Sequence, residues 1–117
     1  MKYQELPGIY ESEKIESSND GLPIDETVRP GMFTFTRDGR ISVVSASDKM
    51  VMAYVGSYRV EDDVLKIAIE SCVYRDMEGT TITRRILRFD GTHLVLEAVG
   101  SKSKERSVLT WKKKIPL

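Results

Sequence analysis

Short runs of alternating apolar and polar residues, bounded by Gly, Asp, Asn and Pro, most constrain what this chain can fold into. A period of two places successive side chains on opposite faces of a β-strand, whereas an amphipathic helix needs a period near 3.6. No stretch has a helical period of useful length. The pattern predicts eight strands, over residues 8–17, 31–37, 40–46, 52–60, 64–72, 81–89, 93–99 and 107–114. We therefore expect an all-β protein that forms one domain over residues 1–117.

The predicted connections between these strands alternate in length. Asp38-Gly39, Asp62-Asp63 and Asp90-Gly91 fill tight turns. Asp-Gly is a hairpin signal because glycine adopts positive φ without steric cost. The other connections are longer. Since alternate connections of an up-and-down meander lie at opposite ends, tight turns close one end and longer loops surround the open one. The sequence predicts a single eight-stranded antiparallel up-and-down barrel, which has no exposed strand edge.

Charges on the first and last strands favour closure of this barrel. The first strand carries Glu11, Glu13 and Glu16, and the last carries Lys112, Lys113 and Lys114. Opposite charges on neighbouring strands contribute roughly 0.2–1 kcal/mol per well-placed pair. Strand pairing therefore explains the acidic first half and the basic second half without a nucleic-acid partner.

The overall composition narrows the classes of partner. Eighteen acids balance eighteen bases, which predicts no binding to nucleic acid or to an anionic membrane. No apolar run approaches the ~20 residues of a membrane span, and the start MKYQELPGIY has no signal-peptide pattern. The single cysteine, Cys72, allows no internal disulfide. We expect a cytoplasmic protein, and a homodimer is compatible with the sequence.

A two-residue turn at Asp62-Asp63 fixes which side chains face inward on the two strands it joins. It pairs Val60 with Leu65, Tyr58 with Ile67, Gly56 with Ile69 and Tyr54 with Ser71. This face is apolar near the turn and more polar away from it, so we expect it to line the interior. Cys72 then points outward.

The Asp90-Gly91 hairpin gives a second inward face by the same argument. It carries Thr83, Arg85, Leu87 and Phe89 on one strand, opposite Leu94, Leu96 and Ala98 on the next. Arg85 is thereby predicted to lie inside, near the open end, and Arg84 outside. Phe33 and Phe35 are expected to face inward from the second strand.

Several motifs, in order along the chain, resemble the lipocalin-like domain family, short relatives of the calycin barrels. They are Gly8-Ile9-Tyr10, TRDGRISV at 36–43, GSYRV at 56–60, ITRRILRFDGTHLVL at 82–96 and LTWKK at 109–113. The resemblance implies an eight-stranded cup that binds small, mostly hydrophobic molecules. Some relatives catalyse cyclisation or isomerisation inside the barrel, so it also implies an enzymatic alternative.

Few residues point to metal or nucleophilic chemistry. His93 is the only histidine, which argues against a zinc site or a Ser-His-Asp triad. No histidine is placed by the sequence to activate Cys72. Glycine-rich phosphate and dinucleotide loops are absent from the sequence. We expect no metal and no cofactor.

The predicted site occupies the open half of the barrel. Its residues are Phe33, Phe35, Tyr54, Tyr58, Ile69, Ser71 and Arg85. Arg85 would either form an internal ion pair, with Glu11 or Glu13, or bind a carboxylate or enolate of the ligand. The two tyrosines would supply hydrogen bonds, or proton transfer if their pKa values were lowered. The sequence therefore favours binding of a small hydrophobic molecule; the alternatives are a cofactor-independent cyclase or isomerase and a structural protein whose interior is filled.

Overall fold

The structure, a computed structural model, describes residues 3–19, 22–24, 31–46, 51–99 and 105–117. Its strands are β1 (Gly8–Asn19), β2 (Leu22–Ile24), β3 (Met32–Phe35), β4 (Arg40–Ala46), β5 (Val51–Glu61), β6 (Val64–Cys72), β7 (Thr81–Phe89), β8 (His93–Val99) and β9 (Glu105–Pro116). The only helical element among the described residues is the short 3-10 turn η1 (Arg75–Met77). The expected all-β class is confirmed.

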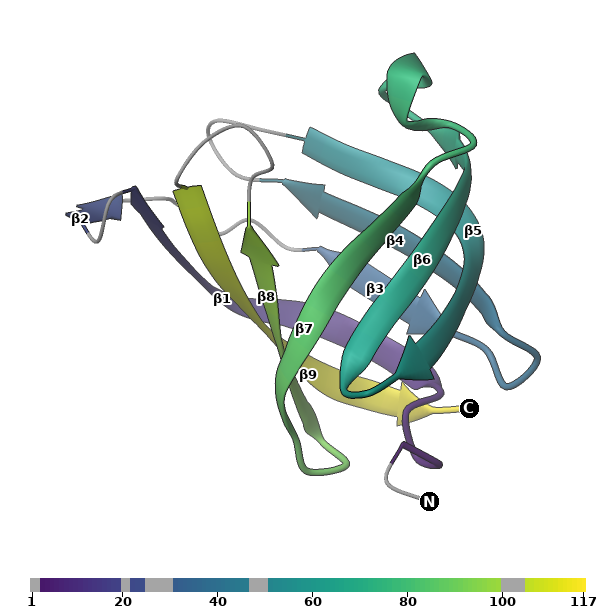
Figure 1. Ribbon diagram of the computed structural model, residues 1–117. Coiled ribbons are helices and arrows are strands. Elements are labelled where there is room, and N and C mark those ends of the chain that lie inside the picture. The colour runs from purple at the N-terminus through teal and green to yellow at the C-terminus, as the bar shows by residue number, and fades with distance from the viewer. Residues whose placement is uncertain (1–2, 20–21, 25–30, 47–50, 100–104) are drawn as a thin grey trace.

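Eight of these strands close into an antiparallel up-and-down barrel (Figure 1). Neighbours in sequence pair from β3 to β9, β1 pairs with β3, and β1 also pairs with β9 to complete the ring. The short β2 was not predicted. It pairs with the far end of β1, at Ser17–Asn19, outside the ring.

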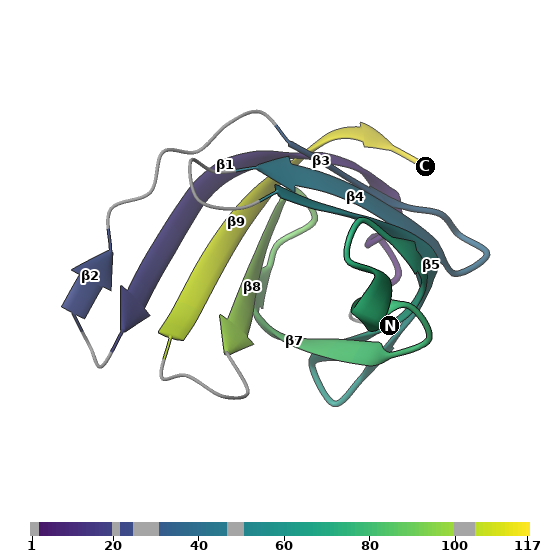
Figure 2. The same cartoon turned by 90° about the horizontal axis from the view of Figure 1, so that it is seen from above.

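The two ends of the barrel differ as the connection lengths predicted. The β3–β4, β5–β6 and β7–β8 turns lie at one end with both termini, and η1 lies at the other (Figure 1). We call these the narrow end and the wide end. Viewed from above, η1 lies over the opening that the strands surround (Figure 2). At the narrow end, Gly39, Asp62, Asp63 and Gly91 have positive φ, as tight hairpin turns require.

The closing pair of strands, β1 and β9, carries the charge complementarity that the sequence indicated. Glu11 pairs in register with Lys112, and Lys114 Nζ lies 3.7 Å from a carboxylate oxygen of Glu11. The pairing runs along nearly the whole of both strands, with irregularities next to Tyr10 and next to Ser12. Both side chains of this ion pair are exposed, so it adds little to stability beyond the backbone pairing.

Aromatic side chains fill the narrow half of the barrel. The ring of Phe35 lies 4.7 Å from Phe33, 5.0 Å from Tyr58 and 5.6 Å from Tyr10, and Phe33 lies 4.8 Å from Trp111. The turn before β1 covers this cluster: Leu6 is 2% exposed, and its carbonyl accepts a hydrogen bond from Tyr10. These packed side chains therefore fill the interior of the narrow half.

Two β-bulges change which side chains face inward. Val55 pairs with Ser71 while Gly56 pairs with Ile69, so Glu70 is an extra residue on β6. Ile86 pairs with Leu96 while Arg88 pairs with Val95, so Leu87 is an extra residue on β7. An extra residue inverts the alternation of its strand on one side of the bulge. Neither bulge was predicted, and both lie beside the predicted site.

No helix among the described residues is long and apolar enough to cross a lipid bilayer.

Candidate functional site

The inner face of the barrel is buried along its middle and partly exposed toward both ends, where Tyr58, Val60 and Phe89 are the partly exposed residues of the narrow end. Tyr10, Phe35, Leu65 and Leu94 are fully buried. The inner residues toward the wide end pack against this core but remain partly exposed: Met52, Cys72, Met77, Ile82 and Leu109. Solvent, or a small molecule, therefore has access to the barrel wall from the wide end.

Arg84, rather than Arg85, occupies the inner face of β7. Arg84 pairs with Leu65, which is fully buried, and the inward Ile82 and Ile86 lie two residues to either side. Arg85 pairs with Val64 and Glu97, and its side chain is exposed. The prediction that Arg85 lies inside was wrong because the bulge at Leu87 shifts β7 by one residue relative to an uninterrupted hairpin.

The Arg84 guanidinium has one hydrogen bond to the described part of the chain. Its Nη1 donates to the carbonyl of Thr83 at 2.9 Å, and no carboxylate of the described residues lies within ion-pairing distance. Burial lowers the pKa of Arg84, and nearby Tyr54 acts weakly in the opposite direction. Because an arginine starts from so high a pKa, it keeps its charge. A positive charge is thus held inside the barrel without a protein counter-ion among the described residues.

Tyr54 lies within electrostatic range of this charge. It is 6% exposed, pairs with Val43 and Cys72, and its hydroxyl has no hydrogen-bond partner among the described residues. Burial raises the pKa of Tyr54 to about 12, although the positive charge of Arg84 acts against that rise. The prediction that Tyr54 faces inward is confirmed. At neutral pH it is a hydrogen-bonding phenol and not a base.

The bulge at Glu70 exchanges Ser71 and Cys72 between the two faces of β6. Ser71 pairs with Val55 and is exposed, so its expected inward position was wrong. Cys72 pairs with Tyr54 and packs against the core, so its expected outward position was also wrong. Both errors have one cause, since the pairs from Val60–Leu65 to Gly56–Ile69 on the turn side of the bulge match the prediction.

The remaining predicted residues face inward but lie at different depths. Phe33, Phe35 and Ile69 are buried, at 4%, 0% and 2% exposure. Tyr58 lies in the narrow half, where its hydroxyl donates to the carbonyl of Thr36 at 2.6 Å. The structure therefore separates Tyr58 from Tyr54, with Phe35 packed against Tyr58 in the narrow half.

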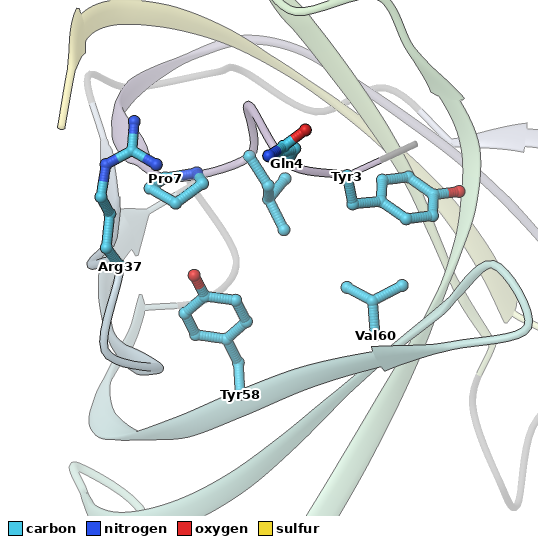
Figure 3. A pocket seen from close by; sticks show the side chains of 7 residues that line it. Tyr3, Gln4, Pro7, Arg37, Tyr58 and Val60 are labelled. Atoms are coloured by element: carbon cyan, nitrogen blue, oxygen red, sulfur yellow. The ribbon is translucent and has the colours of Figure 1, made fainter. Parts of the chain in front are cut away.

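A hollow lies at the narrow end, between the N-terminal turn and β5 (Figure 3). It has a volume of about 590 Å³ and is lined by Tyr3, Gln4, Leu6, Pro7, Arg37, Tyr58 and Val60. Two of its hydroxyls are already bonded to the protein: Tyr58 to Thr36, and Tyr3 to Asp63 at 2.5 Å. Arg37 is exposed to solvent. This pocket offers an apolar surface and one solvated cation.

Trp111 carries the only buried side-chain polar atom without a hydrogen-bond partner in the described part of the protein. Its Nε1 lies in the interior, on a side chain 2% exposed. It is a third donor inside the barrel, in addition to Arg84 and Tyr54.

His93 lies on the outer face of the barrel, at the start of β8. Its Nε2 is 3.3 Å from Glu13 and its Nδ1 is 3.7 Å from Asp90. Two backbone N–H groups, of Thr92 and His93, donate to Asp90 and hold the pKa of that carboxyl well below its usual range. No cluster of His, Cys, Asp or Glu among the described residues has the arrangement of a metal site.

Sequence inspection missed Arg84 and Cys72 as inward residues. Each is adjacent to a residue that was chosen in its place, and Arg84 and Arg85 are chemically identical. One signal was available on β7: Ile82 and Ile86 have the same parity as Arg84, and the assumed register places all three outside.

The titration of Tyr54 provides a test of this geometry. Its phenolate absorbance should appear near pH 12, against a value of 10.0 for an unburied tyrosine. Between these pH values the unfolded chain has lost a proton that the folded protein keeps, so the free energy of unfolding should fall as pH rises through this window. Tyr54→Phe should reduce that fall; Tyr10 and Tyr58, whose pKa values burial also raises, would account for the remainder. Arg84→Met should raise the pKa of Tyr54 further, and a lower pKa in that variant would contradict the proximity of the two groups.

Comparisons with known proteins identify the fold and no family. No family model matches the chain, and no curated protein matches it. Among solved structures, an uncharacterized protein from Bacteroides eggerthii matches with a TM-score of 0.55 at 14% identity, over 92% of this chain and 98% of that chain. A de novo designed fluorescence-activating β-barrel matches with a TM-score of 0.60 at 11% identity, over 95% of both chains. A redesigned β-barrel, mFAP1, bound to DFHBI, matches with a TM-score of 0.54 at 16% identity, over 94% of this chain and 96% of that chain. At these identities the likeness shows a closed eight-stranded β-barrel, in agreement with the strand pairing described above.

Proposed function

We propose that this protein binds a small, mostly hydrophobic molecule in the wide half of its barrel. The observation that supports this most directly is the group of inward apolar residues toward the wide end that remain partly exposed, Met52, Ile82 and Leu109. Apolar side chains that remain accessible inside a concave wall are the usual lining of a ligand site. An eight-stranded barrel has room for side chains or for one small ligand.

The structural neighbours are consistent with this use of the fold. The redesigned barrel mFAP1 is described as bound to DFHBI, and the de novo designed barrel as fluorescence-activating. A barrel of this size can therefore hold a small organic molecule. The low sequence identities mean that the identity of the ligand must come from the residues of this chain.

Binding is favoured over catalysis by the state of Tyr54. A tyrosine that takes up protons in a reaction at neutral pH needs a lowered pKa, and burial raises the pKa of Tyr54 to about 12. The wall around it offers Cys72, apolar side chains and Arg84, which keeps its charge and so cannot act as a base. We therefore propose a binding role for this site.

Filling the wide half should abolish binding. The neutral dye N-phenyl-1-naphthylamine, which becomes fluorescent in apolar surroundings, serves as the probe. Ala98 is a small inward residue next to buried Leu96, and Val99 on the same strand is 64% exposed. Ala98→Phe should weaken dye binding at least about tenfold, the effect of ~1.4 kcal/mol, while Val99→Phe should leave it unchanged. Circular dichroism would confirm that both variants fold.

Other outcomes would count against this location. Unchanged dye binding by a folded Ala98→Phe variant would exclude the wide half. If Val60→Phe, at the narrow end, were the variant that lost binding, the dye would occupy the pocket of Figure 3 instead.

A further inference from the structure

The charged groups on the inner face of the barrel are of one sign. Arg84 is inward, whereas the carboxylates of the described residues belong to exposed or outward positions such as Glu11, Glu13 and Glu70. Glu97, the least exposed of them, pairs with exposed Arg85 across the strands and accepts a hydrogen bond from Arg106. The interior is therefore a positive environment bounded by apolar side chains.

The two carboxylates that the sequence offered as internal partners are engaged elsewhere. Glu11 lies 3.7 Å from Lys114, and Glu13 lies 3.3 Å from His93. Both pairs are on the outside of the β1–β9 pairing. The sequence left open an internal ion pair between an inward arginine and Glu11 or Glu13. Arg84, the inward arginine, forms no such pair with either residue.

An uncompensated charge inside a protein is unfavourable, because the guanidinium loses hydration without gaining a counter-ion. A guanidinium carries five N–H donors in a planar fork, and Arg84 uses one of them on Thr83. The free donors lie within electrostatic range of Tyr54, whose hydroxyl makes no hydrogen bond to the described residues. The fork is suited to a planar oxyanion, which accepts two parallel hydrogen bonds from it, and the Tyr54 hydroxyl is the candidate donor of a third.

We infer that the ligand of this barrel is a hydrophobic organic acid whose carboxylate is bound by Arg84, with Tyr54 as a second hydrogen-bond donor. This inference rests on the proposed function, since it concerns the same site. The acid group lies against β5 and β7, and the apolar body of the ligand lies along Met52, Ile82 and Leu109 toward the wide end. Arg84 thus recognises the ligand's negative charge, and the shape of the apolar wall selects the rest of the molecule.

The test compares two competitors of equal shape and different charge. The neutral dye N-phenyl-1-naphthylamine reports occupancy, and 2-naphthoate or 2-naphthamide displaces it. Both competitors have the same rings and nearly the same size, but only the first is an anion at neutral pH. We expect naphthoate to displace the dye at a concentration about tenfold or more below that of naphthamide, as a charge-assisted hydrogen-bonded pair provides.

Variants of four residues test which side chain causes the preference for naphthoate over naphthamide. Arg84→Met should abolish the preference for naphthoate and leave naphthamide unchanged. Arg84→Lys should keep part of it, because lysine retains the charge but not the fork. Tyr54→Phe should reduce it a few-fold. The matched controls Arg85→Met, on the outer face, and Arg37→Met, at the narrow-end pocket, should leave it intact.

Thermal unfolding gives a second readout that does not depend on the dye. Without ligand, Arg84→Met should unfold at the same temperature as the wild type or higher, because it removes an unpaired charge. Naphthoate should raise the midpoint of the wild type and not that of the variant. A midpoint lowered by Arg84→Met, with the preference for naphthoate unchanged, would mean that a carboxylate of the protein pairs with Arg84, and would overturn the inference.

The remaining outcomes separate the inference from the proposed function. If the dye binds but naphthoate and naphthamide displace it equally, the barrel binds hydrophobic molecules without selecting acids, and only the inference fails. If neither dye nor competitor binds the wild type, the proposed function fails too. Loss of the preference in Arg37→Met alone would place the anion at the narrow end and overturn the assignment to Arg84.

Discussion

Replacing Gly56 by alanine is expected to destabilise the protein by about 3 kcal/mol or more, the upper end of overpacking effects. A Cβ atom at Gly56 would lie 2.0 Å from the backbone carbonyl oxygen of Ala68, a separation that real Cβ atoms do not show. The obstacle is backbone on the neighbouring strand, so no side-chain rotation relieves it. Gly56 lies at the register shift between β5 and β6, where the extra residue Glu70 is accommodated. Glycine there permits the bulge that places Cys72 beside Tyr54.

Urea unfolding would measure this change, with Gly79→Ala as the control. Gly79 has φ of +81° but open space around a built Cβ, so its substitution carries only the backbone penalty of roughly 1–2 kcal/mol. Equal unfolding midpoints for the two variants would show that β5 and β6 are not as close at Gly56 as described.

Truncating Phe35 to alanine should cost about 3–5 kcal/mol, the usual range for a buried aromatic side chain. Phe35 is fully buried, and its ring contacts the rings of Phe33, Tyr10 and Tyr58 at once. Its removal leaves a cavity in the narrow half that these rings can fill only in part. For a domain whose total stability is of order 5–15 kcal/mol, such a loss is a large fraction.

The control is Leu87→Ala, at the bulge of β7, where the side chain is 39% exposed. Its loss should change the free energy of unfolding by less than about 1 kcal/mol. A Phe35→Ala variant as stable as Leu87→Ala would mean that aromatic side chains do not pack tightly in the narrow half. The proposed site in the wide half would then not be closed at its inner end.

The sequence by itself determined the barrel and its orientation. Alternation with a period of two can be satisfied only by strands, and the tight Asp38-Gly39, Asp62-Asp63 and Asp90-Gly91 turns fixed which end is narrow. The charges of Glu11 and Lys114 on the first and last strands indicated which edges meet. These signals are local or additive, so they survive errors of a residue or two in strand boundaries.

Only the tertiary structure decided which of two neighbouring residues faces the interior. At Glu70 on β6 and at Leu87 on β7, one extra residue reverses the alternation, so Cys72 and Arg84 replace Ser71 and Arg85 inside. The order of residues marks these bulges only weakly, through Gly56 inside a strand and the parity of Ile82 and Ile86, because the position of a bulge depends on how the strands on both sides pack. In the observed register Ile86 is inward and 7% exposed, whereas Leu87 at the bulge is 39% exposed. This choice between two aliphatic neighbours is made only when the barrel closes, and it places Arg84 rather than Arg85 on the inner face.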